Sequence, residues 1–126
     1  MIVFVDLFDV CDLTRSFIGR AMSNLANTYN ALGRHQDALV LQEKALEFQR
    51  RVLPENHPDI GDTCFNISIS YQHTGDNHQA IERACEALRI RQITLPPSHP
   101  HIEQAQTWVR QIEVEIARRA KKQPTK

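Results

Sequence analysis

The sequence repeats itself with a period of 42 residues, and this repeat constrains the fold more than any other feature. Leu53-Pro54 recurs as Leu95-Pro96, and aligning residues 16–57 with residues 58–99 gives 11 identical positions out of 42. The identities fall on residues that set turns and packing distances, among them Asn24, Tyr29, Gly33, Ala38, Ala45, Leu46 and His57. A fixed period of this length predicts stacked copies of one supersecondary unit.

Each period contains two stretches in which apolar residues step by three or four positions, the spacing of an amphipathic helix. The first stretches carry Ile18, Met22, Leu25, Ala26 and Tyr29 in one period, and Ile60, Cys64, Ile67 and Tyr71 in the next. The second stretches carry Ala38, Leu41, Ala45, Leu46, Phe48 and Val52, and then Ala80, Ala84, Ala87, Leu88 and Ile93. We therefore expect two helices in each period, with small alanines that allow the helices to approach closely.

Turn residues separate the expected helices. Gly33 and Gly75 follow the first helices, where a residue that enters the left-handed region at low cost is needed. Asp37 or Asn77 can then cap the second helix. The last proline of each Leu-Pro-x-x-His-Pro loop fits the first position of the following helix, where its missing N–H has no consequence.

Two helices joined by a short turn form an antiparallel hairpin, and such a hairpin covers its apolar face only by stacking on a neighbour. The sequence therefore predicts an all-α fold, a solenoid of antiparallel helical hairpins. We divide the chain into a degenerate N-terminal cap or remnant of an upstream repeat (1–15), repeat 1 (16–57), repeat 2 (58–99), a C-terminal capping helix (100–119) and a basic flexible tail (120–126).

The joint pattern of the two periods is specific. It consists of Asn24-Leu25-Ala26-x-x-Tyr29, Leu32-Gly33-Arg34, Ala38-Leu39, Glu43-Lys44-Ala45-Leu46 and Leu53-Pro54-x-x-His57-Pro58. This pattern resembles tetratricopeptide repeats of the kinesin-light-chain type, and the resemblance covers about residues 16–105. It implies a right-handed superhelix segment whose first helices line a concave side.

The two ends of the chain differ from the repeats. Aligned as a third first helix, residues 100–119 place Arg110 and Glu113 at core positions, where charges are hard to bury. We therefore expect a solvated closing helix with the apolar stripe Ile102, Ala105, Val109, Ile112 and Ile116. At the other end, Phe4 and Phe8 offer apolar surface that invites self-association.

Composition excludes several classes of function. Fifteen Lys and Arg balance 15 Asp and Glu, and the pI is near 7.0, so we expect neither a nucleic acid nor a membrane as partner. The three cysteines are an odd number at no metal-ligand spacing, which argues against a disulfide framework or a zinc site. We expect a cytoplasmic location.

Nothing in the sequence points to an enzyme. We find no glycine-rich phosphate loop, no nucleophile elbow and no pair of opposed carboxylates, and we expect no cofactor and no metal. His57 and His99 are equivalent loop residues before a proline, so a capping or packing role is sufficient for both. Cys64 and Cys85 are expected to be structural.

The candidate site is a groove on the first helices, one face away from their core stripes. The candidate groove consists of Arg20, Ser23, Asn24, Asn27, Phe65, Asn66, Ile69, His73 and Trp108. Carboxamides both donate and accept hydrogen bonds, so Asn24, Asn27 and Asn66 can hold the backbone of an extended peptide whatever its side chains. Alternatively, Asn24 and Asn66 cross-link neighbouring helices.

The resemblance also bears on the class of ligand. Chaperone-tail clamps of this superfamily combine asparagines with several basic residues, but here Ser23, Gln104 and Trp108 stand where the basic residues belong. Kinesin-light-chain-like grooves take extended peptides, often a tryptophan flanked by acids. Arg20 can meet an acidic flank, whereas Asp62 opposes one.

We expect a protein–protein interaction module, an adaptor or scaffold that binds an extended peptide or a partner helix. One alternative is a structural spacer or self-association segment of a larger repeat protein. Another is a sensor arm beside a nucleotide-binding domain that is absent from this sequence.

Overall fold

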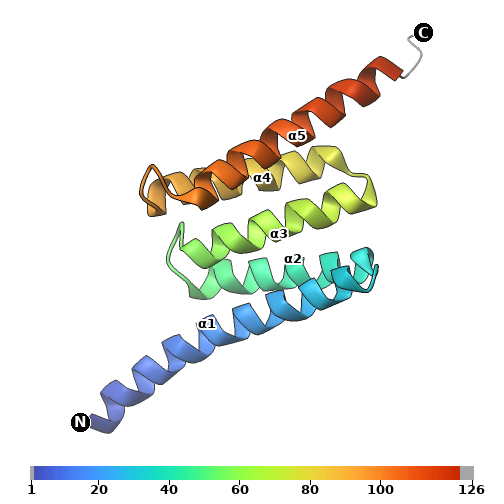
Figure 1. The fold of residues 1–126 in the computed structure, drawn as a ribbon. Helices are drawn as coiled ribbons and strands as arrows, with labels where there is room; N and C mark the ends of the chain where they lie inside the picture. Colours follow the sequence, from blue (N-terminus) through green and yellow to red (C-terminus); the bar gives the residue numbers. More distant parts are fainter. Residues whose placement is uncertain (1, 123–126) are drawn as a thin grey trace.

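The chain forms a stack of helices. The computed structural model describes residues 2–122, with side chains described at Thr14 and from Phe17 onward. These residues form α1 (Ile2–Ala31), α2 (His35–Val52), α3 (Pro58–Thr74), α4 (Asn77–Thr94) and α5 (Pro100–Lys122). The helices follow one another in chain order, and α1 and α5 lie at opposite ends of the stack (Figure 1). The expected all-α solenoid of antiparallel hairpins is confirmed.

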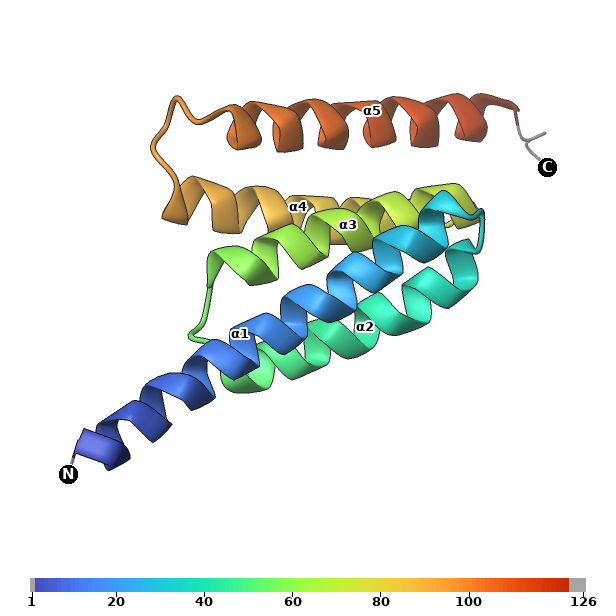
Figure 2. The same cartoon turned by 60° about the horizontal axis from the view of Figure 1, so that its bottom comes forward.

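First helices lie together on one side of the stack. Each helix contacts the next one in the chain, and α1 also contacts α3. Viewed after a turn of 60°, α1 lies over α2, and α5 forms a separate layer on α4 (Figure 2). Residues of α1, α3 and α5 can therefore share a surface although 42 residues separate equivalent positions.

Two helices are longer than the sequence predicts. α1 runs without interruption from Ile2, so residues 2–15 join the first helix of repeat 1. Phe4 and Phe8 lie outside the described side chains, and the role of this region as a cap or remnant stays a prediction. α5 continues to Lys122, past the predicted end at residue 119.

The glycine turns form as expected. Gly33 and Gly75 have φ angles of 78° and 90°, in the left-handed region that side chains with a Cβ avoid. The N–H of Gly75 bonds back to the carbonyl of Gln72, which closes α3. Glycine at these two positions lets each hairpin turn within a few residues.

The caps of the second helices differ from the prediction. Asp76, not Asn77, caps α4, and its Oδ1 accepts the N–H of Gln79 at 3.1 Å. In repeat 1 the N-cap residue of α2 is Arg34, and its side chain makes no capping hydrogen bond to α2. Asp37 instead accepts from Arg34 Nε at 2.8 Å, so it forms an ion pair rather than a cap.

The loop histidines cap the first helices. Nδ1 of His57 accepts the N–H of Asp59 at 3.0 Å, and Nδ1 of His99 accepts the N–H of His101 at 3.1 Å. Each bond satisfies a backbone donor that the helix start leaves free. The capping role expected for His57 and His99 is confirmed, and it explains why the histidine recurs before each helix-starting proline.

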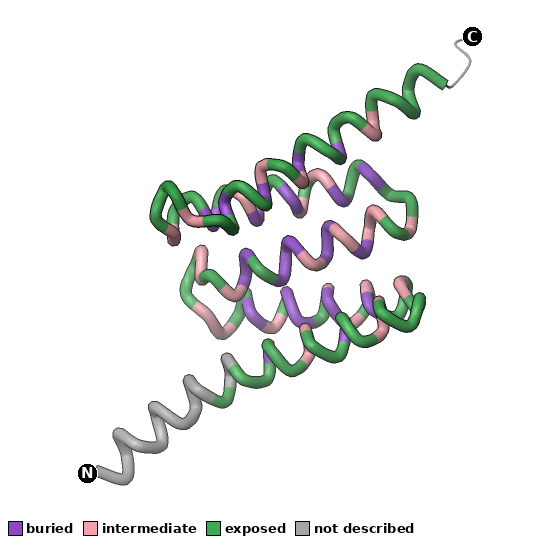
Figure 3. Tube along the Cα trace, viewed as in Figure 1, coloured by how far each residue is buried: buried purple, intermediate pink, exposed green. Residues whose placement is uncertain are grey.

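Burial depends on whether a neighbouring helix is present. Ile60 and Ile67 of α3 are 4% and 0% exposed against α2, whereas the equivalent Ile18 and Leu25 of α1 are 41% and 49% exposed. Figure 3 shows buried residues concentrated on α2, α3 and α4. Ile18 and Leu25 are therefore exposed although the sequence placed them in a core stripe, because no described helix covers that side of α1. Ile93 of α4, also expected in the core, is 60% exposed.

The stripe of α5 is the one that the sequence predicts. Ile102, Ala105, Val109 and Ile112 are buried, and Ile116 is half-buried. Arg110 and Glu113 are exposed, which avoids the cost of burying their charges.

Glycines in the middle of first helices allow close packing. A Cβ at Gly61 would lie 3.0 Å from Cγ2 of Ile90, and a Cβ at Gly19 would lie 2.9 Å from Nε2 of Gln49. These two glycines are one period apart. The equivalent residue of α5 is Glu103, which is exposed.

The contact between the two hairpins, where α2 packs on α3, is polar at its buried centre. Thr63 donates to Oε1 of Gln49 at 2.6 Å, and Ser70 donates to Oε1 of Gln42 at 2.7 Å. All four residues are at most 2% exposed. We call this set, Gln42, Gln49, Thr63 and Ser70, the polar seam between α2 and α3.

Arg91 holds three helices together. It is only 6% exposed, its Nη1 donates to the carbonyl of His101 at 3.1 Å, and its Nη2 donates to Oδ1 of Asp62 at 3.2 Å. Its guanidinium also lies 4.5 Å from the ring centre of Phe65. Arg91 of α4 thus bonds to both α3 and the start of α5.

Replacing this arginine should loosen α5. We expect Arg91→Ala to lower the free energy of unfolding by about 2–3 kcal/mol, because it removes a buried side chain and its charge-assisted bonds. Urea titration followed by circular dichroism measures the loss. Arg89→Ala is the matched control, since exposed Arg89 bonds only to Asn56 among the interactions described, at 2.9 Å, and should cost less than about 0.5 kcal/mol. Equal losses in the two variants would contradict the role of Arg91.

Candidate functional site

Five residues of the candidate groove meet in one hollow between α1 and α3. This polar hollow has a volume of about 270 Å³. It is lined by Arg20, Ser23, Asn24, Asn27, Gln49, Asp59, Asp62, Thr63 and Asn66. The helical spacing places Arg20, Ser23, Asn24 and Asn27 on one face of α1, and the α1–α3 contact brings Asn66 opposite them.

The carboxamides of the polar hollow are available to a ligand. Asn24 and Asn27 are exposed and Asn66 is half-buried. In the described part of the chain, no side-chain hydrogen bond joins any of the three amides to another residue. Other side chains link α1 to α3: Nδ2 of Asn30 donates to Oγ of Ser70 at 2.9 Å, and Oγ of Ser23 lies 3.5 Å from Oγ1 of Thr63. This arrangement argues against a cross-linking role for Asn24 and Asn66.

Charges in the polar hollow are largely paired. Nε of Arg20 lies 3.6 Å from Oδ2 of Asp59, and Asp62 accepts from Arg91. The Arg20 side chain is still 69% exposed, so solvent screens its ion pair and a ligand can approach it. Asp62 is 58% exposed and would repel an acidic ligand at the same place.

A second, more apolar hollow lies between α3 and α5. It has a volume of about 500 Å³. It is lined by Phe65, Ile69, Pro100, Glu103, Gln104, Thr107, Trp108 and Gln111. The three apolar residues that the sequence assigns to the groove, Phe65, Ile69 and Trp108, therefore lie together.

These apolar side chains contribute unequally. Phe65 is 8% exposed and packs between Arg91 and Trp108, whose ring centre is 6.4 Å away, so it is a core residue that forms the floor of the hollow. The Trp108 indole N–H donates to Oγ of Ser68 at 2.8 Å. That bond fixes the ring, and the half-buried surfaces of Trp108 and Ile69 are left for apolar contact.

His73 lies apart from both hollows. Its ring stacks on that of His35 with the centres 4.3 Å apart, near the turn between α1 and α2. Nδ1 of His35 in turn lies 2.8 Å from Oδ1 of Asn30. The structure thus brings together eight of the nine predicted residues in two neighbouring hollows, and it places the ninth in a histidine stack.

Sequence reasoning missed the residues at the base of the polar hollow. Gln49 and Thr63 line it from the polar seam, and Arg91 anchors Asp62 at its edge. One signal was present: Gln49 and Arg91 are equivalent positions, one period apart, and both are polar near the C-terminal end of a second helix.

Comparison with known proteins decides the family. The family model described as tetratricopeptide repeat matches residues 17–93, which is more than half of the chain. The chain belongs to the tetratricopeptide repeat family. Such repeats generally mediate protein–protein interaction and scaffolding, and they are typically not enzymes. The family expected from the sequence motifs is confirmed.

Solved tetratricopeptide structures share this fold. The TPR-like repeats of a protein from Podosopora anserina assigned as a kinesin light chain match with a TM-score of 0.70 and 24% identity over 79% of this chain. A variant of that protein with one substitution matches with a TM-score of 0.70 and 23% identity, again over 79% of this chain. This chain spans 47% of each of those chains, about half their length. A search of curated proteins found no match.

The described part of the tetratricopeptide stack shows neither a metal site nor a membrane-spanning helix. Among the side chains that the structure describes (Thr14 and Phe17 to Lys122), no group of three histidine, cysteine, aspartate or glutamate residues is arranged to hold a metal ion. None of the described helices combines the length and the apolar character needed to cross a bilayer.

The two described cysteines are poor nucleophiles. Burial, with help from the nearby Glu86 carboxylate, raises the pKa of the Cys64 thiol from 9.0 to about 12. Partial burial and then Glu113 raise the pKa of the Cys85 thiol. Because the thiolate is the reactive form, both thiols stay protonated and unreactive near neutral pH.

The raised pKa of Cys64 predicts a loss of stability in alkali. The unfolded chain releases this proton near pH 9, whereas the folded chain keeps it to about pH 12, so stability is complete below pH 9 and falls as the pH rises above it. Tyr71 and Cys85, with raised pKa values, add to the fall. Urea unfolding between pH 8 and pH 10.5 should show Cys64→Ala with a slope shallower by up to about 1.4 kcal/mol per pH unit. An unchanged slope would refute this assignment.

Proposed function

We propose that this chain is a non-enzymatic adaptor module that binds an extended peptide along the candidate groove. The observation that carries the proposal is the set of three carboxamides, Asn24, Asn27 and Asn66, whose side chains face the polar hollow without a hydrogen-bond partner among the described residues. An extended peptide offers an N–H and a carbonyl at each residue, and an amide side chain can bind both. Recognition of this kind depends on the main chain of the ligand and tolerates variation in its side chains.

The apolar hollow adds a preference for one kind of side chain. It adjoins the polar hollow along α3, where Phe65 and Asn66 are consecutive residues. Ile69 and Trp108 present apolar surface there, so a large apolar side chain of the peptide fits beside the amide contacts. Asp62 disfavours an acidic residue at the polar end, whereas Arg20 tolerates one.

We expect weak binding by this chain alone. Two repeats cover little of a peptide, and the peptide loses conformational freedom when it is ordered. Dissociation constants in the micromolar range are the expected scale.

Removing two of the carboxamides should test the groove. Peptides selected from a display library on the wild-type chain should bind Asn24→Ala/Asn66→Ala about tenfold or more weakly, because two hydrogen bonds to the main chain are lost. Calorimetry measures the affinity, and circular dichroism should show unchanged helicity.

The control for this experiment removes two carboxamides outside the groove. Gln36 of α2 and Gln92 of α4 are exposed, so Gln36→Ala/Gln92→Ala should bind the selected peptides like the wild type. If the Asn24→Ala/Asn66→Ala variant binds the selected peptides with the affinity of the wild type, the groove assignment is wrong.

A second candidate function is self-association. Phe17, Ile18 and Leu25 of α1 are 73%, 41% and 49% exposed, and Ile18 and Leu25 are equivalent to Ile60 and Ile67, which are buried in α3. We propose that a second copy of the chain can cover this face, since apolar surface of this kind favours association.

Light scattering tests self-association directly. The average mass should rise with concentration toward a dimer, and Phe17→Ser/Leu25→Ser should remain monomeric with the same helical content. Val114→Ser, which alters an apolar residue 66% exposed on α5, should not change the mass. A wild-type chain that is monomeric at every concentration would rule this function out.

A further inference from the structure

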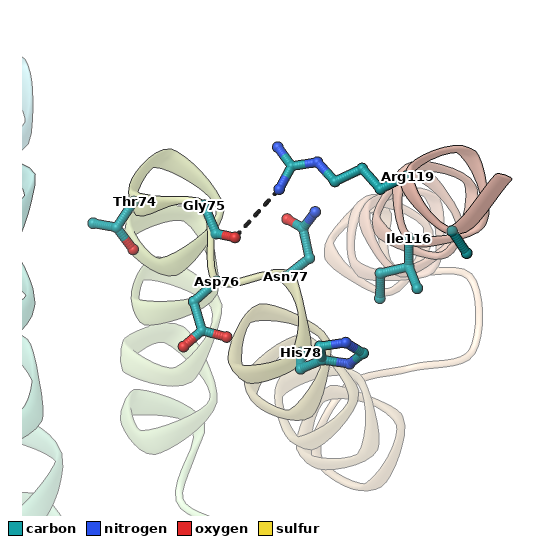
Figure 4. A pocket seen from close by; sticks show the side chains of 8 residues that line it. Thr74, Gly75, Asp76, Asn77, His78, Ile116 and Arg119 are labelled. Atoms are coloured by element: carbon teal, nitrogen blue, oxygen red, sulfur yellow. Dashed lines mark hydrogen bonds between the residues drawn. The ribbon is translucent and has the colours of Figure 1, made fainter. Parts of the chain in front are cut away.

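A pocket that shares no lining residue with the polar or the apolar hollow lies beside the turn between α3 and α4. It opens between the Gly75 turn, the start of α4 and the last turns of α5, and its volume is about 510 Å³. Figure 4 shows Asn77 and His78 reaching it from α4, with Ile116 and Arg119 facing them from α5. We call it the turn pocket.

Asn77 is the unusual residue of this pocket. It is 6% exposed, and neither its Oδ1 nor its Nδ2 has a hydrogen-bond partner within the described part of the chain. Figure 4 shows its amide pointing into the space between Gly75, Ile116 and Arg119. Leaving a buried amide unpaired is unfavourable, so a ligand that pairs both atoms is bound more tightly.

At the equivalent position of repeat 1, the side chain already contacts other residues of the chain. His35 lies one period before Asn77, and its ring is covered by His73 and bonded to Asn30. The residue of α5 equivalent to His73 is Glu115, which pairs with Arg118 and Arg119 instead. Among the described residues, the second repeat therefore lacks the contacts that complete this site in the first.

The other polar groups that face Asn77 are hydrogen-bond donors, namely backbone N–H groups of α4 and the guanidinium of Arg119. The backbone N–H groups of Asn77 and His78 are in the first turn of α4, an 18-residue helix, where no intrahelical partner exists and the helix dipole favours an anion. Arg119 donates Nη1 to the Gly75 carbonyl at 3.3 Å and Nε to Glu115 at 3.0 Å, and no bond of its Nη2 is described.

Local charge is compatible with a carboxylate ligand. Two guanidinium groups share Glu115, whose pKa they hold below its usual value, and Lys121 and Lys122 follow in the same helix. The opposing charge is Asp76, whose carboxylate is already bonded to the N–H of Gln79. Arg119 thus balances Asp76 among the lining residues, and Lys121 and Lys122 add positive charge in the last turn of α5.

We propose that the turn pocket binds an acidic residue of an extended peptide, separately from the candidate groove. The main-chain amide of the peptide pairs with both atoms of the Asn77 amide. The neighbouring carboxylate bonds to Arg119 and to the free N–H groups of α4. This ligand supplies both kinds of partner that the pocket lacks, which a simple anion or a neutral amide does not.

Nuclear magnetic resonance on the full chain tests the site with defined probes. We expect acetyl-Gly-Glu-Gly-amide to shift the side-chain NH₂ signals of Asn77 and the backbone signals of Asn77 and His78 saturably. Acetyl-Gly-Gln-Gly-amide, which lacks the carboxylate, and acetate, which lacks the amide, should each bind roughly tenfold more weakly. Asn24→Ala/Asn66→Ala should leave these shifts unchanged, so the result does not depend on the groove.

Variants of the two key side chains complete the test. Asn77→Ala and Arg119→Ala should each weaken binding of the glutamate peptide roughly tenfold. Arg118→Ala is the matched control, because it removes the same charge from Glu115 but does not line the pocket, and it should stay within about twofold. Arg119 is exposed, so its variant folds even if Asn77→Ala does not.

Two outcomes would overturn the proposal. If acetate binds as tightly as the glutamate peptide, the pocket is a plain anion site and the peptide assignment is wrong. If no probe moves the Asn77 signals and the amide contacts only a bound water, the pocket has no ligand of this class.

Discussion

The contact between the second helix of one hairpin and the first helix of the next is the interaction on which this structure depends. A single hairpin leaves an apolar face uncovered, and only a neighbour in the stack can bury it. Ile60 and Ile67 are buried by that contact, whereas Ile18 and Leu25 are exposed without it. The same apolar stripe is thus a core or a surface, according to what stands next to it.

The candidate groove follows from the same stacking. Placing α1, α3 and α5 on one side brings residues 42 positions apart into a common surface, without any long connection between them. The bonds that hold these helices together include those of Asn30 with Ser70, Ser23 with Thr63 and Trp108 with Ser68. Asn24, Asn27 and Asn66 are not needed for that purpose, which leaves their amides for recognition.

Local signals allowed the repeat architecture to be predicted. The period follows from aligning the sequence with itself, and the positive φ at Gly33 and Gly75 and the capping by His57 and His99 follow from residues within a few positions of each other. The cap at Asp76 was missed by one residue, because two consecutive polar residues both suit a helix start.

Tertiary features were harder to predict. The burial of Arg91 depends on partners in α3 and at the start of α5, and the exposure of Ile18 depends on a helix that is absent from the described chain. Phe65 was assigned to a ligand surface, but Arg91 and Trp108 enclose it. For the candidate site, helical spacing gave the shared face of α1 and α3, whereas the division into two hollows and the place of His73 required side-chain positions.

The polar seam makes the order of the repeats matter. Gln42 and Gln49 meet hydroxyl groups at Ser70 and Thr63, but the equivalent positions of α5 are Ile112 and Ala105, which pack on the alanines of α4. If the two junctions were exchanged by recombination, the glutamines would face apolar side chains and lose their hydrogen bonds. Although the repeats share one backbone plan, each junction therefore accepts only its own neighbour, so these repeats are not interchangeable building blocks.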